Sequence, residues 1–370
     1  MRLFFLVILA TSVTARFTDD FYQLLAEKNA DKNLISSPLS VEIAMSMAYI
    51  AARGKTVKEI AKVLNVTTDN NQLIKKYKDF LTKVVRKNTR YSILNLANRI
   101  FVNDNYKLIT SFNETFRDAF KAESPAINFR NPDEAASIVN KWVANQTLDR
   151  THDIVKSEDM DPDLMAVFVN ANYFKSHWYV EFDPKNTKTS DFRITDQNRV
   201  PVQMMSQKGP FRAEYFEDLD AKVIELAVHD YDNELAILIF LPEKIDGLME
   251  LEKKIRGFSR YIGLYEGTLE LPKFKIEYSE DLKSILQTMG IRSAFSSADF
   301  IGLEKPGNMK VLHKDFIEVN EEGDKAFSHP MLPPVIYPPR NVTVDHPFAY
   351  IVQDVRKTIY FQGHVVNPGA

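Results

Sequence analysis

The pattern of apolar and polar residues changes character along the chain, from helical spacing in the first half to strand-like alternation in the second half. Phe17 to Lys28 has apolar residues on one helical face, which predicts an amphipathic first helix. Val41 to Ala52 is apolar almost all round, as expected of a helix buried in a large core. Val311 to Val319 alternates, and Pro347 to Val366 predicts a strand hairpin. The pattern therefore indicates the α+β class.

The segment between these two strand-like runs is too long for a turn and is rich in proline. Because proline has no backbone N–H, this segment cannot form a central strand and is predicted to be an extended, solvated loop. A connection of roughly 20 residues without structure of its own is usually functional or disordered. A disordered linker remains an alternative, but strand-forming sequence continues almost to the C-terminus and favours a loop that interrupts a domain.

Composition narrows the class of protein. The chain has 370 residues, 45% of them hydrophobic, and a formal net charge of −3. That charge excludes a polyanion-binding role for the whole surface, so we expect no nucleic-acid partner. Cysteine is absent, which excludes disulfides, thiolate zinc sites and thiol catalysis. A core of this size can stabilise the fold without such cross-links, and we expect a monomer.

The N-terminus has the pattern of a secretory signal peptide. Arg2 precedes an apolar run, and the small residues that end at Ala15 are typical of a signal-peptidase site. We expect cleavage after Ala15, so that residues 1–15 are removed. No later apolar stretch approaches the length of a membrane span. The mature protein is therefore predicted to be secreted and extracellular, with no membrane partner.

Several segments, in order along the chain, resemble the serpin superfamily. NLISSPLSVEIAMSMAYIAARGKTVKEIAKVL resembles the buried second helix and the turn after it, and VFVNANYFKSHW resembles the central sheet strand that ends in tryptophan. VLHKDFIEVNEEG resembles the strand that leads into the reactive loop, and VDHPFAYIV the strand that leaves it. The resemblance covers residues 16–370 as a single domain. It implies the serpin fold: three β-sheets, about eight to nine helices and an exposed reactive-centre loop at about residues 323–345.

The resemblance also implies positions for the sites that control loop insertion. Trp178 matches the residue at the top of the central sheet, called the breach, although it fits an ordinary core aromatic equally well. The loop hinge corresponds to Glu321, Glu322, Gly323, Asp324, Lys325 and Ala326. The polar cluster under the sheet, called the shutter, corresponds to Ser37, Pro38, Ser40, Asn170 and His313. An alternative is that these five are simply hydrogen-bonded core residues.

Counting from the hinge glycine as in the family places the reactive bond after Tyr337, with Ile336 as a neighbouring candidate and Arg340 as a displaced one. Tyr337 suits a chymotrypsin-like protease, but Pro338 follows it and makes a poor scissile bond. The partner implied is an extracellular serine protease. An inhibitory member of this family is a single-use trap, whose cut loop inserts into the central sheet.

The hinge departs from the family pattern of a small or hydroxyl residue followed by alanines. If the first residue after Gly323 faces inward, the buried row of an inserted strand is Asp324, Ala326, Ser328, Pro330, Leu332 and Pro334. A buried carboxylate and missing N–H groups oppose insertion. We therefore hold two hypotheses. One is a secreted protein that acts as substrate, carrier or ligand without trapping efficiently, and the other is a true inhibitor that is cut after Tyr337.

Signatures of enzymes are not found in the sequence. It has no G-x-S-x-G, H-E-x-x-H, P-loop or G-x-G-x-x-G pattern. The seven histidines are scattered without ligand spacing. We therefore predict no catalytic residues, no cofactor and no metal site. A third hypothesis, an unrelated hydrolase, has no motif in its favour.

One segment is strongly basic. Gln72 to Arg90 predicts an amphipathic helix, and one face of it carries the four cations that we call the basic stripe: Lys76, Lys83, Lys87 and Arg90. A matching helix binds sulfated polysaccharide in some serpins, so a sulfated polysaccharide is a candidate partner. A solvated lysine face is the alternative. Release of counterions would make polyanion binding dependent on salt.

The chain has four acceptor motifs for N-linked glycans, at Asn65, Asn113, Asn145 and Asn341. In a secreted chain we expect at least half of them to be used. Asn341 lies close to the candidate reactive bond.

Overall fold

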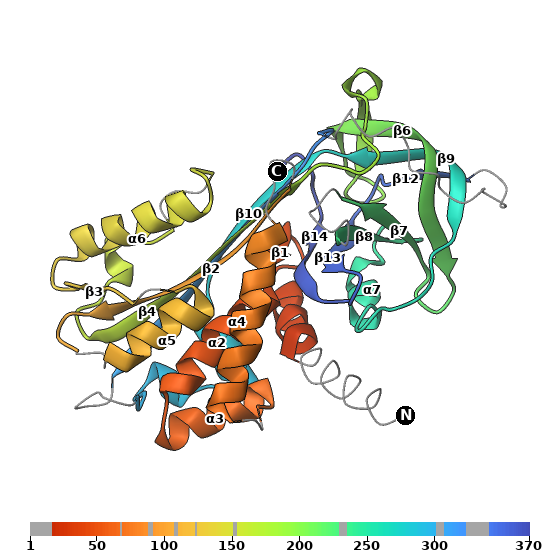
Figure 1. Ribbon diagram of the computed structural model, residues 1–370. Coiled ribbons are helices and arrows are strands. Elements are labelled where there is room, and N and C mark those ends of the chain that lie inside the picture. The colour runs from red at the N-terminus through yellow and green to blue at the C-terminus, as the bar shows by residue number, and fades with distance from the viewer. Residues whose placement is uncertain are drawn as a thin grey trace, which may run out of the picture.

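A computed structural model of the chain describes residues 17–66, 69–87, 92–106, 110–122, 124–150, 154–228, 235–300, 307–322 and 340–370. Its described part contains eight α-helices, which agrees with the expected number. Figure 1 shows how most of them are arranged around the sheets. The first covers residues 17–28, as predicted. The others are α2 (Pro38–Ala51), α3 (Gly54–Leu64), α4 (Asn70–Lys87), α5 (Thr110–Phe120), α6 (Pro132–Gln146), α7 (Leu248–Lys254) and α8 (Lys283–Met289), with short 3₁₀ turns at Ser157–Asp159, Pro184–Asn186 and Ser293–Phe295.

A five-stranded sheet forms the centre of the molecule, in the order β10-β11-β4-β2-β3. Four of these strands are long, because alternating apolar runs continue through them without a proline. The β10·β11 and β4·β2 pairs are antiparallel, whereas β11·β4 and β2·β3 are parallel. The strands are β10 (Phe274–Asp281), β11 (Asn308–Val319), β4 (Leu164–Ser176), β2 (Ser92–Asn103) and β3 (Ala126–Ile127).

The remaining strands form one nine-stranded sheet, in which β5 pairs with β6 beside the main order β1-β14-β13-β8-β7-β6-β9-β12. The resemblance implied three sheets. Two of those sheets are continuous here, because β6 is 18 residues long and pairs with β9 along one part and β7 along another. The strands are β1 (Leu34–Ser36), β5 (Lys188–Arg193), β6 (Arg199–Phe216), β7 (Ala221–Ala227), β8 (Leu235–Pro242), β9 (Leu264–Pro272), β12 (Arg340–Thr343), β13 (Phe348–Asp354) and β14 (Ile359–Val365).

The main core lies between the two sheets and around α2. As the sequence predicts, α2 is buried nearly all round, and it packs against the five-stranded sheet and β14. Helix α4 buries only one face, through Leu73, Tyr77, Leu81 and Val84. Burying each of these side chains is worth about 1.5–3 kcal/mol, so the apolar face fixes α4 on the core and leaves its basic face to solvent.

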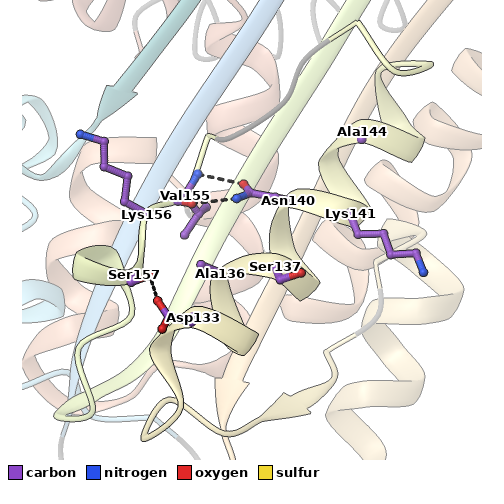
Figure 2. A pocket seen from close by; sticks show the side chains of 9 residues that line it. All are labelled: Asp133, Ala136, Ser137, Asn140, Lys141, Ala144, Val155, Lys156 and Ser157. Carbon is purple, nitrogen blue, oxygen red and sulfur yellow. Dashed lines mark hydrogen bonds between the residues drawn. The ribbon is translucent and has the colours of Figure 1, made fainter.

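Helix α6 covers the opposite face of the five-stranded sheet (Figure 1). The segment after this helix is tied back to it, as Figure 2 shows. The Asn140 amide accepts from the Val155 N–H at 2.9 Å and donates to the Val155 carbonyl at 2.8 Å, and Ser157 donates to Asp133. The two bonds between the Asn140 side chain and the Val155 main chain hold residues 154–157 against α6 above β4.

A buried ionic cluster fixes the C-terminal strand. His364 of β14 is fully buried, with Nδ1 2.7 Å from Glu252 Oε1 and Nε2 2.8 Å from the Lys32 carbonyl. Because both ring nitrogens face acceptors, this geometry requires a doubly protonated imidazole. Burial alone would lower the pKa of His364, but the hydrogen bond and charge of Glu252 outweigh it and raise that pKa above 6.5. Tyr22 donates to the same Glu252 oxygen at 2.5 Å.

The sequence predicts neither a membrane span nor a metal site, and the structure can be searched for both only within the described residues. Among them, no helix is long and apolar enough to cross a membrane. Within the same ranges, no group of three or more acidic or histidine side chains is placed to hold a metal ion. The predicted signal peptide, residues 1–15, lies outside the described ranges.

Candidate functional site: the seam of the central sheet and the anchors of the loop

The parallel contact between β4 and β11 is the exceptional feature of the central sheet, and we call it the seam. It runs from Asn308 opposite Leu164 to Ile317 opposite Phe174, with one irregularity between Asn308 and Met309. The outer neighbours of both strands pair with them antiparallel. A segment that turned back after β11 and entered the seam would be antiparallel to β11 and to β4. Antiparallel pairing is slightly the more stable kind, so the seam is a site that a further strand can fill.

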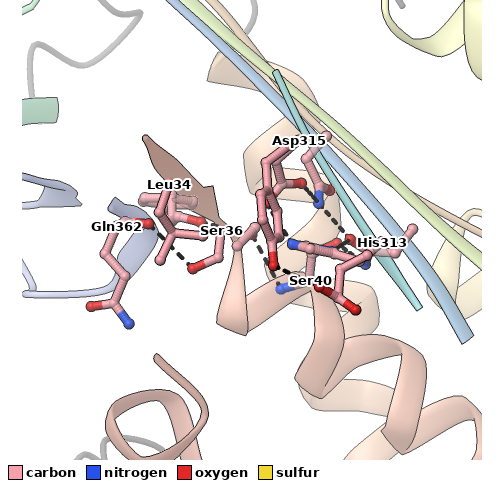
Figure 3. Close-up of polar contacts among 12 residues, drawn as sticks. Leu34, Ser36, Ser40, His313, Asp315 and Gln362 are labelled. Carbon is pink, nitrogen blue, oxygen red and sulfur yellow. Dashed lines mark hydrogen bonds and ion pairs between the residues drawn. The ribbon is translucent and has the colours of Figure 1, made fainter. Parts of the chain in front are cut away.

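The shutter residues predicted on different segments meet beneath this seam (Figure 3). Asn98, Asn170 and His313 are opposite one another across β2, β4 and β11. The Asn170 amide donates to Ser40 Oγ and to Asn98 Oδ1, both at 2.6 Å, and its oxygen lies 2.7 Å from His313 Nδ1. Ser40, Asn170 and His313 are thus hydrogen-bonded core residues, joined with Asn98 in one buried network, and their role in loop insertion stays a prediction.

Ser37 and Pro38 place α2 beneath the sheet. Ser37 caps the helix by accepting from the Ser40 N–H, and it donates to the Tyr360 carbonyl of β14 at 2.7 Å. Pro38 follows at the first helical position, where its missing N–H costs nothing. The cap therefore fixes both the start of α2 and the direction from which Ser40 approaches the seam.

Three members of this network were not anticipated from the sequence: Asn98, Asn172 and Asp315. Asn172 donates to Asp315 Oδ1 at 2.5 Å, which bridges the seam from β4 to β11. Asp315 is fully buried, and its other oxygen lies 2.7 Å from His313 Nε2 without the alignment of a hydrogen bond. The signal was present in the sequence, since Asp315 follows His313 by two residues and must share its face of the strand.

Trp178 holds the chain where it leaves β11. Its indole N–H donates to the Asn320 carbonyl at 2.6 Å, and its main-chain N–H donates to the Glu322 carbonyl at 3.0 Å. The ring is buried and packs edge-on against Phe182. Trp178 is thus a core aromatic, and it also fixes the first residues of the hinge at the end of the seam.

Ion pairs hold the two hinge glutamates. Glu321 accepts from Lys273 at 2.8 Å and from Thr187 at 2.7 Å. Burial alone would raise the pKa of Glu321, but the bonds from Lys273 and Thr187 outweigh burial and bring the pKa below its ordinary value. Glu322 lies 2.5 Å from Lys175 Nζ. These contacts with Lys273 and Lys175 keep the two hinge glutamates on the sheet.

The chain resumes in β12, which pairs in parallel with β9. Arg340 is opposite Gly267, and its guanidinium lies 3.8 Å from the centre of the Tyr265 ring and 3.3 Å from Glu214 Oε1. A side chain on Gly267 would collide with the Arg340 carbonyl, because an added Cβ would lie 1.6 Å from that oxygen. The displaced reactive-bond candidate Arg340 is therefore part of a paired strand.

The other hinge and reactive-bond candidates lie outside the described residues. They are Gly323, Asp324, Lys325, Ala326, Ile336, Tyr337 and Pro338. Their assignment stays a prediction from the sequence.

The basic stripe is described in part. Lys76 and Lys83 are exposed on α4, while the Lys87 side chain and Arg90 lie outside the description. Lys76 lies 3.4 Å from Glu42, so part of its charge is matched. All four glycan acceptors are exposed: Asn65, Asn113, Asn145 and Asn341.

Comparison with known proteins agrees with this geometry. Residues 12–368 match the family model described as Serpin (serine protease inhibitor). The chain is 40% identical to "Serine protease inhibitor 42Dd" of Drosophila melanogaster over 365 residues, which covers 97% of each chain. It is 30% identical to "Leukocyte elastase inhibitor" of Xenopus laevis, covering 97% of this chain and 99% of that one. The chain belongs to the serpin family.

Solved structures show the same fold. Serpin48 of the insect Tenebrio molitor, described as a highly specific serpin, aligns with a TM-score of 0.85 and 29% identity over 96% of this chain and 97% of its own. Uncleaved ovalbumin aligns with a TM-score of 0.86 and 25% identity, over 96% of this chain and all of its own.

Proposed function

We propose that this serpin is secreted, presents residues 323–339 to extracellular serine proteases, and is cut there as a substrate more often than it traps the enzyme. The observation that carries the proposal is the chemistry of the buried face of the seam. On β11 that face is formed by His313, Asp315, Ile317 and Val319, all nearly or fully buried. It already contains one carboxylate, that of Asp315.

An inserted loop would add a second carboxylate to this layer. With the first residue after Gly323 facing inward, Asp324 enters the same buried face as Asp315. Burying an unpaired carboxylate costs several kcal/mol. Further along, Pro330, Pro333 and Pro334 remove N–H groups that the strand must donate. Trapping competes with hydrolysis of the acyl-enzyme, and each 1.4 kcal/mol on the insertion barrier slows insertion about tenfold.

The second candidate function is efficient inhibition of a chymotrypsin-like protease that cuts after Tyr337. It is favoured by the relatives at 30–40% identity that are named as inhibitors of a serine protease or of leukocyte elastase. It is also favoured by the seam, which β4 and β11 close without an intervening strand and which is therefore available for insertion.

One experiment distinguishes the two. The secreted protein is incubated with chymotrypsin, elastase and trypsin, and the products are separated in SDS. The substrate proposal expects a chain cut between Gly323 and Arg340, little SDS-stable complex and little gain in melting temperature. A stoichiometric stable complex with any of these proteases would contradict it and support the inhibitor.

A hinge variant tests the physical reason. Asp324→Ser restores the small hydroxyl residue of the family pattern and should increase the fraction of stable complex. Asp196→Ser is the matched control, because it removes a carboxylate from the exposed turn between β5 and β6. An equal yield of complex from both variants would show that Asp324 is not the obstacle.

A further inference from the structure

The outer edge of β2 is paired over only a short length by β3. Strand β3 pairs with β2 only at Val102 and Asn103, so the preceding residues of β2 have a strand partner on one side only. The Val102 N–H points outward to the Pro125 carbonyl at 3.1 Å. Because outward and inward N–H groups alternate along a strand, those of Leu96, Asn98 and Ile100 face the same edge.

In the part of the chain that the structure describes, none of these three N–H groups meets a main-chain carbonyl. An open strand edge of this kind is a template for pairing with another chain. From Leu96 to Ile100 the edge is about 14 Å long at 3.4 Å per residue, which matches an extended segment of about five residues.

A groove with a volume of about 430 Å³ follows this edge and is lined by side chains of α4 and α5 on one side and of α6 on the other. We call it the β2-edge groove. Its apolar wall includes Leu81, Val84 and Phe120, which are buried side chains of α4 and α5. Trp142 of α6 forms the opposite side. The groove thus offers apolar contacts beside main-chain donors, the combination that recognises an extended peptide.

The charged groups of the groove have one sign. Arg99, Arg117 and Lys121 line it, and no carboxylate is among its lining side chains in the described ranges. Arg99 stacks on Trp142, with 5.3 Å from the guanidinium carbon to the ring centre. The nearby Asp118 is paired with Lys78 at 2.6 Å. Cations beside apolar walls select a partner that carries carboxylates and apolar side chains.

We propose that the β2-edge groove binds an extended acidic segment of a partner protein, which adds to the open edge of β2 as a further strand. The length of the open edge favours a peptide over a small amphipathic anion. A small anion would use the basic side chains and the apolar wall but leave the row of N–H groups without acceptors.

The test uses a fluorescein-labelled hexapeptide of alternating aspartate and valine, and its binding to the full chain is measured by fluorescence anisotropy. Glycans are removed first, because the acceptor Asn145 lies beside the groove residue Gln146. Two further peptides are N-methylated on alternate residues. In one of them the methyl groups lie along one edge of the extended peptide, and in the other they lie along the opposite edge. One methylated form should bind about tenfold more weakly and the other within twofold of the parent, because only one peptide edge bonds to β2. Equal binding of both forms would overturn strand addition.

Variants test the site itself. Arg117→Glu with Lys121→Glu, both exposed positions, should weaken binding at least about tenfold. Lys76→Ala with Lys83→Ala, on the solvent face of α4, should leave it unchanged. Absence of peptide binding would overturn the proposal, as would equal sensitivity to both variants or equal binding of the lysine-valine peptide. Binding of dodecanoate without binding of the peptide would instead identify a site for a small amphipathic anion.

Discussion

The bridge between Asn172 and Asp315 is the clearest target for mutagenesis, because it crosses the seam that must open for insertion. A hydrogen bond to a charged group contributes about 1.5–3 kcal/mol. Asn172→Ala leaves the fully buried Asp315 carboxylate without its amide donor, and Asp315→Ala removes one of the two acceptors of the Asn172 amide, the other being Asn170 Oδ1. We expect each variant to lower the free energy of unfolding by about 2–4 kcal/mol. In the double variant the loss of unfolding free energy should be smaller than the sum of the two single losses by about 1.5–3 kcal/mol.

The same bridge should slow insertion of a cut loop. The contact exists only while β4 and β11 are adjacent, so its loss is part of the barrier to opening. If about 1.4 kcal/mol of the coupling is lost at the barrier, Asn172→Ala should speed insertion about tenfold. The measurement cuts the loop with chymotrypsin and follows the rise in melting temperature with time.

A matched control removes an amide elsewhere in the sheet. Asn103 is fully buried on β2 and donates to the Pro162 and Leu164 carbonyls at 2.9 and 2.8 Å, and neither bond crosses from β4 to β11. Asn103→Ala should destabilise the intact protein without speeding insertion. Equal insertion rates for Asn172→Ala and Asn103→Ala, or a coupling energy below about 0.5 kcal/mol in the cycle, would refute this role of the bridge.

Four further predictions follow from other sites. The raised pKa of His364 means that its stabilising charge is fully present below pH 6.5 and is lost as the pH rises through the folded-state pKa. The melting temperature should therefore fall from pH 6 to pH 9, and Glu252→Gln should reduce this fall; identical pH profiles would contradict the pairing. Trp178→Phe should cost about 1–2 kcal/mol by leaving the Asn320 carbonyl unpaired, and denaturant titration measures it. Replacing all four basic-stripe residues by alanine should lower the salt at which the protein elutes from heparin, and elution of the unaltered protein at low salt would exclude that ligand. Mass spectrometry of the protein recovered from the medium of an animal-cell host should find a glycan on Asn341, and an unmodified asparagine would refute this.

Much of the fold could be predicted from the sequence because the apolar residues of the long elements follow a clear helical or strand-like pattern. The buried helix α2 and the hairpin of β13 and β14 were predicted to within a few residues. Ser40, Asn170 and His313 were placed in one cluster only because the resemblance supplied the pairing of the strands. Asn98, Asn172 and Asp315 were missed, because polar residues in strands reveal their partners only when the register between distant segments is known.

The groove and the ion pairs of the hinge could not be predicted for a related reason. Lys175 and Lys273 are ordinary surface cations in the sequence, and only the strand order brings them to Glu322 and Glu321. The open edge of β2 depends on the short length of β3, which is two residues in the structure. No local sequence pattern indicates over how many residues two strands pair.

The pairing of β12 with β9 makes cleavage a condition for complete insertion. The chain is fixed on both sides of residues 323–339, at Glu322 by Trp178 and at Arg340 by the contact with Gly267. While the peptide chain is intact, the segment that enters the seam must also reach back to β12, at about 3.4 Å per residue. Only about half of the segment can therefore enter the seam. A cut removes this limit at once. Complete insertion of the uncut chain would therefore also require β12 to separate from β9, a contact that depends on the absence of a side chain at position 267.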